Sequence, residues 1–323
     1  MVPGTFRKQI VLGIIFVGLI AALCFIIFIV DESTDNLPVY SVTGNALDLA
    51  VLDGIVLAGK NISNEGGGIT KAVVVPHHLV ASKSIALGIK ALTASSPRLV
   101  IVISPDHFSR CPKLICATKG SYKTYFGDVF TSKEEVIGLE KSDLVADSNL
   151  FGDEHGIFNI MPFIKYYLPE AQVVSMVISQ NGRGTEQERS EILELLKPLL
   201  TKKDTALVIS SDFSHYLALT ESNEMDKKTQ NSFCSGNSQE ILALQNPSQN
   251  DCPLCLWILE QEAKKLGFWN PRIVAHTNSA DLLRDTSVKE TTSHFTIIFS
   301  DDPLSGNCLI TAPILHELEN IIN

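Results

Sequence analysis

Short apolar runs recur along this chain, and several of them end in polar residues. Residues 71–75 read Lys-Ala-Val-Val-Val, and Pro76, His77 and His78 follow directly. A run of apolar residues rich in β-branched side chains is typical of a strand that is buried on both faces. Proline ends such a strand because it cannot donate a hydrogen bond to a neighbouring strand. We therefore predict that the two histidines lie at the carboxyl end of a core strand, where ligands bind in open α/β sheets.

The same arrangement recurs further along the chain. Residues 98–104 form a second apolar run, which leads through Pro-Asp to His107. Between the two runs, residues 79–95 carry apolar side chains at helical spacing. A strand, a helix and a second strand form a right-handed parallel crossover, which brings both strand ends to the same edge of the sheet. We therefore expect His77 or His78 to lie near His107; the alternative is two unrelated surface histidines.

Two further segments carry polar residues at the end of an apolar run or at the start of a helix. Residues 205–211 lead to Asp212 and His215, and the segment Asp-Glu-His155 begins a predicted helix. Imidazole suits iron, copper, zinc and nickel, and a cysteine thiolate adds a preference for softer metals. These residue types indicate a metal site at the strand ends. Polar residues that are simply hydrogen-bonded at strand ends are the alternative, because no compact motif such as HExxH is present.

The remaining apolar pattern completes one α/β domain. No linker rich in glycine or proline separates residues 46–300. We therefore predict a single domain with a central, mostly parallel or mixed sheet that is flanked by helices. Further strands are predicted at residues 171–178, 270–276 and 294–300, and helices at 46–60, 133–140, 186–200, 223–245 and 251–266.

The longest apolar run lies near the N-terminus. Residues 10–30 contain no charged side chain, and a helix of this length spans about 31 Å, enough to cross the hydrocarbon core of a membrane. Arg7 and Lys8 precede the run and acidic residues follow it, so the positive-inside rule predicts a cytoplasmic N-terminus. The predicted organisation is a cytoplasmic N-terminus (1–9), a single-pass transmembrane anchor (10–30), a linker (31–45), an extracytoplasmic α/β domain (46–303) and a C-terminal tail (304–323).

Composition narrows the expected partners. The chain of 323 residues has a net charge of −10 and no basic cluster, so we do not expect it to bind nucleic acid. Its seven cysteines are too few for a disulfide scaffold. Cys111 and Cys116 are close enough in the sequence to form a disulfide in an oxidising compartment, and Cys252 and Cys255 form a CxxC segment.

Four segments resemble the signature segments of the Memo family in their order and spacing. They are Val75-Pro-His77, Ser104-Pro-Asp-His107, Glu154-His155 with Pro162-Phe163, and Ser210-Ser-Asp-Phe-Ser-His215. The family also occurs as protein B of the AmmeMemoRadiSam system, and the resemblance covers roughly residues 70–300. The family shares its fold with the class III extradiol ring-cleaving dioxygenases, which hold non-haem iron(II) with two histidines and a carboxylate.

The resemblance implies a particular metal site. The family's ligands correspond to His77, His107 and a cysteine that takes the place of the dioxygenase carboxylate. Cys252 matches that cysteine most closely because a proline and an apolar helix follow it, and Cys255 is the alternative. A different interpretation is that the two cysteines are buried or paired with each other. Iron(II) is the implied metal, with copper or zinc as alternatives.

The resemblance also implies catalytic roles. His215 matches the acid/base histidine of the dioxygenases, Asp212 would orient it or a substrate, and His155 would line the same pocket. The chain departs from the family at several positions, among them Phe108, which stands where the family has the second of two paired histidines. His78 stands beside the first ligand as an additional candidate, and Phe158 occupies a position where the family has a glutamate.

Together, these patterns predict a membrane-anchored, Memo-like metal-binding protein with non-haem iron or copper redox or dioxygenase-like chemistry. A non-catalytic module that binds a ligand or a protein is the alternative that Phe158 favours. A zinc-dependent hydrolase is the third. The implied partners are the membrane, through the N-terminal helix, a small-molecule or peptide substrate, and other proteins of the AmmeMemoRadiSam system.

Overall fold

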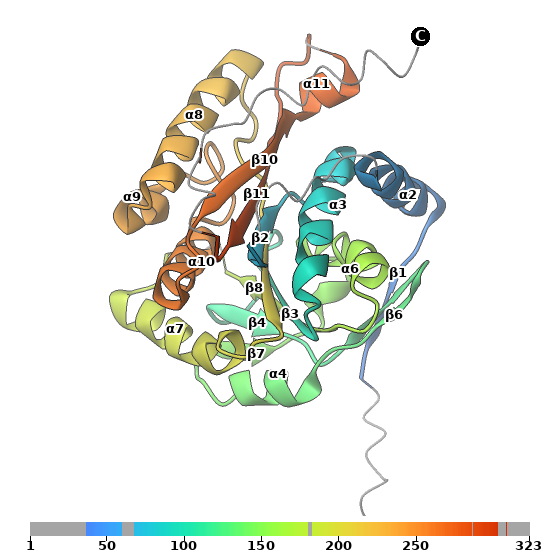
Figure 1. Ribbon diagram of the computed structural model, residues 1–323, viewed down its shortest axis with the longest axis vertical. Coiled ribbons are helices and arrows are strands. Elements are labelled where there is room, and N and C mark those ends of the chain that lie inside the picture. Colours follow the sequence, from blue (N-terminus) through green and yellow to red (C-terminus); the bar gives the residue numbers. More distant parts are fainter. Residues whose placement is uncertain (1–36, 60–67, 180–182, 286, 303–307, 309–323) are drawn as a thin grey trace, which may run out of the picture. The chain divides into compact units, whose positions relative to one another are not determined.

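A mixed eight-stranded sheet with helices on both faces forms the centre of the molecule (Figure 1). The computed structural model describes residues 37–59, 68–179, 183–285, 287–302 and 308. In spatial order the strands are β10 (Pro271–Asn278), β11 (Ser293–Ser300), β2 (Thr70–Val75), β9 (Thr205–Ser210), β3 (Leu99–Pro105), β8 (Gln172–Ile178), β4 (Ile115–Ala117) and β7 (Val145–Asp147). The predicted α/β architecture with a central mixed sheet is confirmed.

The middle of this sheet is parallel. β9 lies between β2 and β3 and pairs with both of them, with Val75 opposite Ser210 and Ile103 opposite Ile209. The prediction that β2 and β3 end at the same edge is confirmed, but the sequence did not indicate that β9 separates them. Three apolar strands therefore deliver the residues that follow them to one edge of the sheet.

Alternate side chains of the central strands fill two hydrophobic layers. Along β2, Ala72 and Val74 pack into one layer and Val73 and Val75 into the other, because successive residues of a strand point to opposite faces. The helices α2 (Asn45–Gly59), α3 (Ser82–Ala91) and α6 (Met161–Tyr167) cover one face, and α7 (Glu186–Leu200) and α10 (Pro253–Leu266) cover the other (Figure 1). Burial on both faces explains why these strands are continuous apolar runs.

Local signals at the helix ends position the elements around the sheet. α7 begins with a capping box, in which the side chains of Thr185 and Glu188 each accept a backbone N–H of the other residue. α10 begins with Pro253. Proline is suited to this position because the first N–H groups of a helix have no carbonyl partner within the helix, so no hydrogen bond is lost. The remaining helices are α4 (Lys133–Leu139), α5 (His155–Phe158), α8 (Leu219–Ser235), α9 (Ser238–Ala243) and α11 (Ser279–Leu283), with 3-10 turns at Leu79–Ala81, Leu92–Ser95 and Leu150–Gly152.

A second, three-stranded sheet contains β1 (Val39–Val42), β5 (Ser121–Thr124) and β6 (Gly127–Val129). β1 falls within the range 31–45 that the sequence predicted as a linker, and it is ordered there by parallel pairing with β5. Disulfides join Cys111 to Cys116, as the sequence spacing allowed, and Cys234 to Cys308.

The structure does not describe the residues of the predicted membrane anchor. Within the ranges given above, no helix combines the length and the apolar character that a membrane span requires. The predicted N-terminus (1–9) and anchor (10–30), and most of the predicted tail (304–323), lie outside those ranges.

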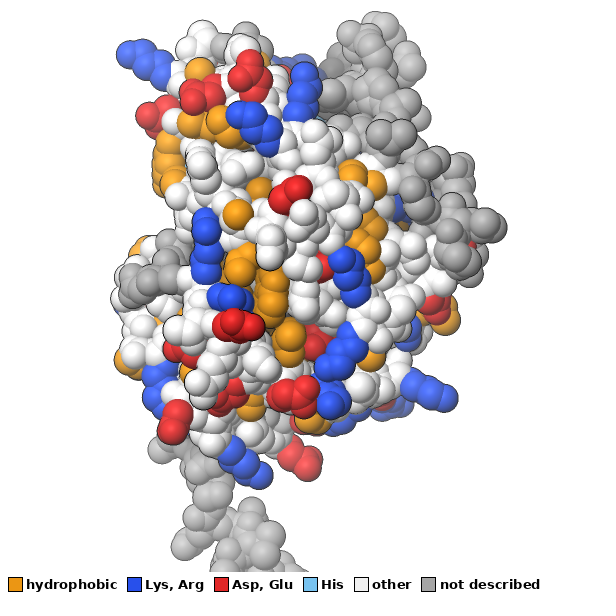
Figure 2. Space-filling view, turned by 90° about the vertical axis from the view of Figure 1, so that its left-hand side faces the viewer, with side chains coloured by type: hydrophobic (Ala, Val, Ile, Leu, Met, Phe, Trp, Pro, Cys, Tyr) orange, Lys and Arg blue, Asp and Glu red, His pale blue; other side chains and the backbone are white. Residues whose placement is uncertain are grey.

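Charged side chains of both signs cover the face that carries α7, α8 and α9. Figure 2 shows Lys and Arg side chains interspersed with Asp and Glu side chains on this face, so neither sign dominates it.

Candidate metal centre

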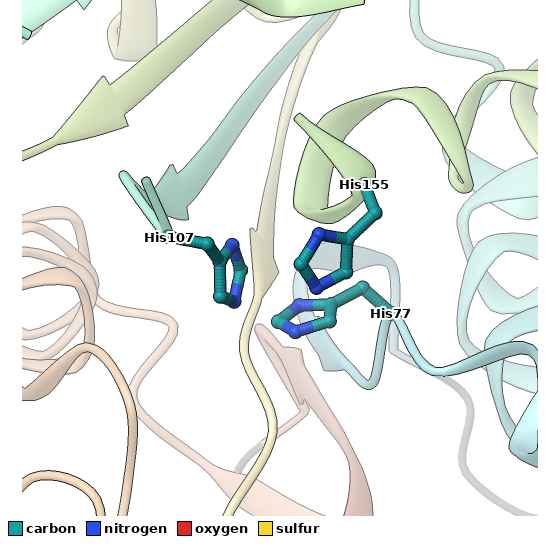
Figure 3. A group of neighbouring side chains, drawn as sticks. All are labelled: His77, His107 and His155. Atoms are coloured by element: carbon teal, nitrogen blue, oxygen red, sulfur yellow. The ribbon is translucent and has the colours of Figure 1, made fainter. Parts of the chain in front are cut away.

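Three histidine side chains meet at the edge of the sheet where β2 and β3 end (Figure 3). His77 follows β2, His107 follows β3, and His155 is the first residue of α5. The ring centroids are 4.6 Å apart for His77 and His107, 5.1 Å for His77 and His155, and 4.0 Å for His107 and His155. One nitrogen from each ring lies within 4.8 Å of the other two, close enough for the three to hold one metal ion. We call these three residues the histidine cluster.

A buried carboxylate fixes the orientation of His107. Nδ1 of His107 lies 2.6 Å from Oε1 of Glu154, and the backbone N–H of His107 donates to Oε2 at 3.0 Å. Glu154 is also the N-cap of α5, because its side chain accepts the backbone N–H of Gly156. Since Nδ1 donates to the carboxylate, the lone pair of the neutral ring lies on Nε2. That Nε2 atom is buried and has no hydrogen-bond partner among the described residues.

The charges around His107 favour a cation. Burial lowers the pKa of His107, but the carboxylates of Asp251 and Glu154 outweigh burial and raise that pKa to about 10. Burial would raise the pKa of Glu154, yet its hydrogen bond to His107 and the charge of that ring lower it. A proton and a metal ion compete for Nε2 of His107. Both are cations, so the negative charge of the two carboxylates stabilises whichever of them is bound.

His77 is the most deeply buried member of the cluster, with an exposed fraction of 1%. Its Nδ1 lies 3.3 Å from the hydroxyl oxygen of Ser210, and its backbone N–H donates to Oδ1 of Asp212 at 3.3 Å. Its Nε2 lies 3.4 Å from Oδ2 of Asp212 and 3.4 Å from Oδ2 of Asp251. Burial lowers the pKa of His77 in spite of the two aspartates, which favours the neutral ring that a metal requires.

His155 lies on the more exposed side of the cluster. Burial and the neighbouring rings of His77 and His107 lower its pKa to about 4, so this ring is neutral near pH 7. The sequence predicted His155 as a catalytic residue that lines the pocket. In the structure, one of its ring nitrogens lies within 4.8 Å of a nitrogen from each of the two histidines that were predicted as metal ligands.

Asp212 connects the cluster to another buried histidine. Oδ1 of Asp212 lies 3.2 Å from Nδ1 of His294 and also accepts the backbone N–H of His77. Burial would raise the pKa of Asp212, but His77 and His294 outweigh burial and lower it. Asp212 therefore contacts these two histidines, whereas the sequence pattern associated it with His215.

Two further predicted residues lie beside the cluster. His215 donates from Nδ1 to the carbonyl oxygen of Phe213, and its backbone N–H donates to Pro247 at 3.1 Å. His78 packs its ring against His294, with the ring centroids 5.6 Å apart. In the described structure, neither of them joins the three-residue donor group.

Cys252, the predicted third metal ligand, forms a disulfide with Cys255. The thiolate is the form of cysteine that binds metals, and a disulfide sulfur carries no thiolate. The donor group of this structure accordingly contains His155 where the sequence predicted Cys252. The pairing corresponds to the alternative in which the two cysteines bond to each other.

Two buried residues of this region were missed by the sequence analysis. Asp251 precedes Cys252, and its Oδ2 lies 3.7 Å from Nε2 of His107. An acidic residue directly before a helix that begins Cys-Pro is the signal that could have revealed it. His294 lies in β11, where every residue is buried, and a histidine inside such an apolar strand is the corresponding signal.

The donor set fits a transition metal. Imidazole nitrogens with carboxylates beside them are ligands that iron and zinc use in proteins, and imidazole also suits copper. A pocket of about 190 Å³ adjoins the site, and its lining includes Asp251, Arg183 and the apolar side chains of Ile178, Leu244 and Leu254. The fold and the site thus define an α/β protein with a histidine-rich metal centre at the ends of its central strands.

Comparisons with known proteins identify the family. The family model described as Memo-like protein matches residues 55–293. A MEMO1 family protein of Pyrobaculum aerophilum is 24% identical over 225 residues, which cover 67% of this chain and 79% of that protein. A MEMO1 family protein of Thermoplasma volcanium is 28% identical over 162 residues, which cover 48% of this chain and 58% of that protein. One of Pyrobaculum arsenaticum is 25% identical over 222 residues, which cover 64% of this chain and 76% of that protein. The chain belongs to the Memo family, as the resemblance of its motifs predicted.

Proposed function

We propose that this chain binds a transition metal at the histidine cluster and uses it for redox or dioxygenase-like chemistry. The observation that supports this most directly is the convergence of three imidazole donors within 4.8 Å of one another. Two of the donors follow β2 and β3, the strands on either side of β9 in a buried sheet, and such rigid elements hold ligands more accurately than mobile loops. Nε2 of His107 adds support, because within the described residues it makes no hydrogen bond and faces Asp251 at 3.7 Å. A buried nitrogen without a hydrogen bond is a cost that a bound ion would remove.

Iron(II) is the metal that we propose first, with copper and zinc as the alternatives. Histidine nitrogens and a carboxylate that leave coordination positions open are typical of non-haem iron oxygenases. Asp212 and Asp251 both lie 3.4 Å from Nε2 of His77, so carboxylate donors are at hand. Bound iron(II) would supply open positions for a substrate oxygen and for dioxygen.

The protein residues around the cluster would orient groups and move protons. Glu154 holds His107 with Nε2 turned toward the cluster. His215 donates from Nδ1 to a carbonyl oxygen, which can only accept, so its Nε2 carries a lone pair. We propose that this nitrogen accepts a proton from a substrate hydroxyl, a role that suits histidine near neutral pH.

We propose that the pocket lined by Asp251 holds the substrate. Its volume of about 190 Å³ is smaller than the pockets of about 300–1,000 Å³ that hold drug-sized ligands. A small molecule that is partly apolar and carries an anionic or hydroxyl group beside Arg183 would suit this lining better than a folded peptide.

Metal content tests this proposal. The full-length chain, purified without added metal, should contain a stoichiometric transition metal by elemental analysis. His77→Ala and His107→Ala should weaken the affinity for added Zn²⁺ or Fe²⁺ more than about 100-fold. His78→Ala is the matched control, because its ring lies next to the site but packs against His294, and it should retain the parent affinity. Parent protein that binds no better than the two alanine variants would refute the proposal.

A non-catalytic binding role is the second candidate, and Phe158 favours it. Phe158 packs against the hydrophobic layer that includes Ile157 and Phe163, at a position where the family pattern led us to expect a glutamate. Oxygen uptake with iron(II) and a panel of catechols separates the two functions. Uptake that His215→Ala abolishes would support catalysis, whereas metal binding without uptake would favour the binding role.

We also propose that residues 10–30 anchor the α/β domain to a membrane, with the domain on the extracytoplasmic side. The charge-free run and the preceding Arg7 and Lys8 support this topology. A reporter fused after Asn36 should be accessible only from the extracytoplasmic side. Recovery of a processed, soluble domain from cells would contradict an uncleaved anchor.

A further inference from the structure

The carboxylate of Asp251 points at two members of the histidine cluster at once. Its Oδ2 lies 3.4 Å from Nε2 of His77 and 3.7 Å from Nε2 of His107. The two histidines follow β2 and β3, and Asp251 precedes α10, so three separate elements bring these atoms together. In each histidine, Nδ1 faces another group: Ser210 for His77 and Glu154 for His107.

The distances from this oxygen to the two nitrogens are those of ligands around one ion. Distances of 3.4 and 3.7 Å are longer than the usual 2.7–3.2 Å of an N–H···O hydrogen bond. Donor atoms about 2.1 Å from a metal, arranged tetrahedrally, lie about 3.4 Å from one another. The oxygen is therefore farther from each nitrogen than in an ordinary hydrogen bond, and it is close enough to both to share a cation with them.

The position of Asp251 is fixed before any ion binds. Its Oδ1 accepts the hydroxyl of Ser211 at 2.5 Å, and its Oδ2 accepts the backbone N–H of Asp212 at 3.1 Å. The loop that carries Asp251 is tied down on both sides, because Asn246 donates to the carbonyl of Asp251 and Asn250 donates to the carbonyl of Asp212. Ligands that are held in place in this way lose little conformational freedom on binding.

We propose that Asp251 is the anionic ligand of this metal centre, together with His77 and His107. The inference rests on the proposed function, since it assigns a ligand to the same site. It gives the anionic position to a carboxylate, whereas the sequence analysis gave it to Cys252, whose sulfur is bonded to Cys255. A carboxylate oxygen favours iron(II), manganese or zinc over copper(I), which prefers sulfur ligands.

Asp212 is the closest competitor, and its contacts differ. Its Oδ2 also lies 3.4 Å from Nε2 of His77. Within the described structure, however, its ion pairs are with His77 and His294, and it makes none with His107. Its Oδ1 accepts both the backbone N–H of His77 and the ring of His294. Asp212 therefore supports His77, and Asp251 alone of the two faces both nitrogens.

Zn²⁺ affinity of the full-length chain, measured by competition with a chromophoric chelator, tests the assignment. Asp251→Asn keeps the shape of the side chain and should weaken binding as severely as His77→Ala. Asp212→Asn should weaken it by about 10- to 100-fold, less than Asp251→Asn does, and the double variant Cys252→Ser/Cys255→Ser should bind as the parent does. Circular dichroism of each metal-free variant establishes that it is folded. Parent affinity in a folded Asp251→Asn would overturn the inference.

Cobalt(II) distinguishes the carboxylate from a thiolate directly. A cobalt–thiolate bond gives a near-ultraviolet charge-transfer band, which carboxylate and imidazole do not give. The parent loaded with Co²⁺ should lack this band. Asp251→Cys, made in the Cys252→Ser/Cys255→Ser background, should bind Co²⁺ and gain the band. A band in the parent that Cys252→Ser removes would assign the site to Cys252. If the parent and His77→Ala bind equally weakly, the proposed function itself fails, and this inference fails with it.

Discussion

Two buried polar clusters lie near the same edge of this sheet, and they differ in whether their polar atoms are satisfied. The first, which we call the serine–aspartate cluster, joins β10, β11, α8 and the segment after β9, and it consists of Ser214, Ser222, Asp226, His276 and Ser293. Oδ1 of Asp226 accepts the hydroxyls of Ser214 at 2.9 Å and Ser293 at 2.6 Å, and Oδ2 lies 2.8 Å from Nε2 of His276. Each carboxylate and hydroxyl oxygen of this cluster has a partner.

The histidine cluster is as well buried at its centre but is not satisfied. Nε2 of His107 has no hydrogen-bond partner in the described chain, and the carboxylates that face His77 stand at 3.4 Å. Burial and polarity are therefore common to both clusters and do not by themselves indicate a ligand site. Since most buried polar groups in native proteins are hydrogen-bonded, the unsatisfied group is the informative one. We infer that the serine–aspartate cluster stabilises the fold and that the histidine cluster is arranged for an ion.

The largest expected effect that separates the clusters is on stability. Asp226→Ala removes the acceptor of three hydrogen bonds, so the free energy of unfolding should fall by about 3 kcal/mol. Urea denaturation measures this change. The Zn²⁺ affinity of the variant that remains folded should be unchanged. A variant that unfolds as the parent does, or that loses metal, would remove the distinction between the two clusters.

A smaller effect is expected on metal affinity when the support of His107 is weakened. Glu154→Gln keeps the side chain's shape but loses the charge that orients Nδ1 of His107, so Zn²⁺ should bind about 10- to 100-fold more weakly. This corresponds to about 1.4–2.7 kcal/mol. Glu260→Gln is the matched control, because Glu260 is a buried glutamate that pairs with Ser238 and Lys264, away from the cluster. Chelator competition should show no change in the control, and an equal loss in both variants would contradict the proposed role of Glu154.

The sequence predicted those parts of the fold that local patterns determine. The apolar runs of β2, β3 and β9 can be recognised in the sequence because strands buried on both faces exclude polar residues. The insertion of β9 between β2 and β3 depends on pairing between distant segments, which no local pattern specifies. The same reason explains β1, which lies in a predicted linker and is ordered by pairing with β5.

His155, which begins a helix, was assigned to the pocket through the family resemblance. The rest of the site was predicted to the extent that its residues follow strands. His77 and His107 belong to that class, and the structure brings them together. Asp251 and His294 do not, because one precedes a helix and the other lies within a strand. The state of Cys252 depends on whether its sulfur bonds to Cys255. Two thiols separated by two residues are compatible both with a metal site and with a disulfide.

The smallest expected effect concerns an unsatisfied group that lies outside both clusters. Glu262 in α10 is 1% exposed, and its Oε1 has no hydrogen-bond partner within the described ranges. Burial raises its pKa above the ordinary value of 4.5, with a contribution from Glu194, and Lys265 and Lys197 oppose the shift. A raised pKa means that the folded state holds this proton more tightly than the unfolded state. The contribution of Glu262 to stability therefore falls as pH rises from its ordinary pKa to its folded pKa, and it stays low above that interval.

Glu262→Gln should accordingly be more stable than the parent by about 1 kcal/mol near pH 7, and the difference should shrink as the pH approaches about 4. Urea midpoints at the two pH values measure this, and Zn²⁺ affinity should not change, because no histidine nitrogen converges on this oxygen within the described structure. A parent that is the more stable protein near pH 7 would mean that Lys265 or Lys197 outweighs burial. Glu262 would then belong with the satisfied groups of the fold.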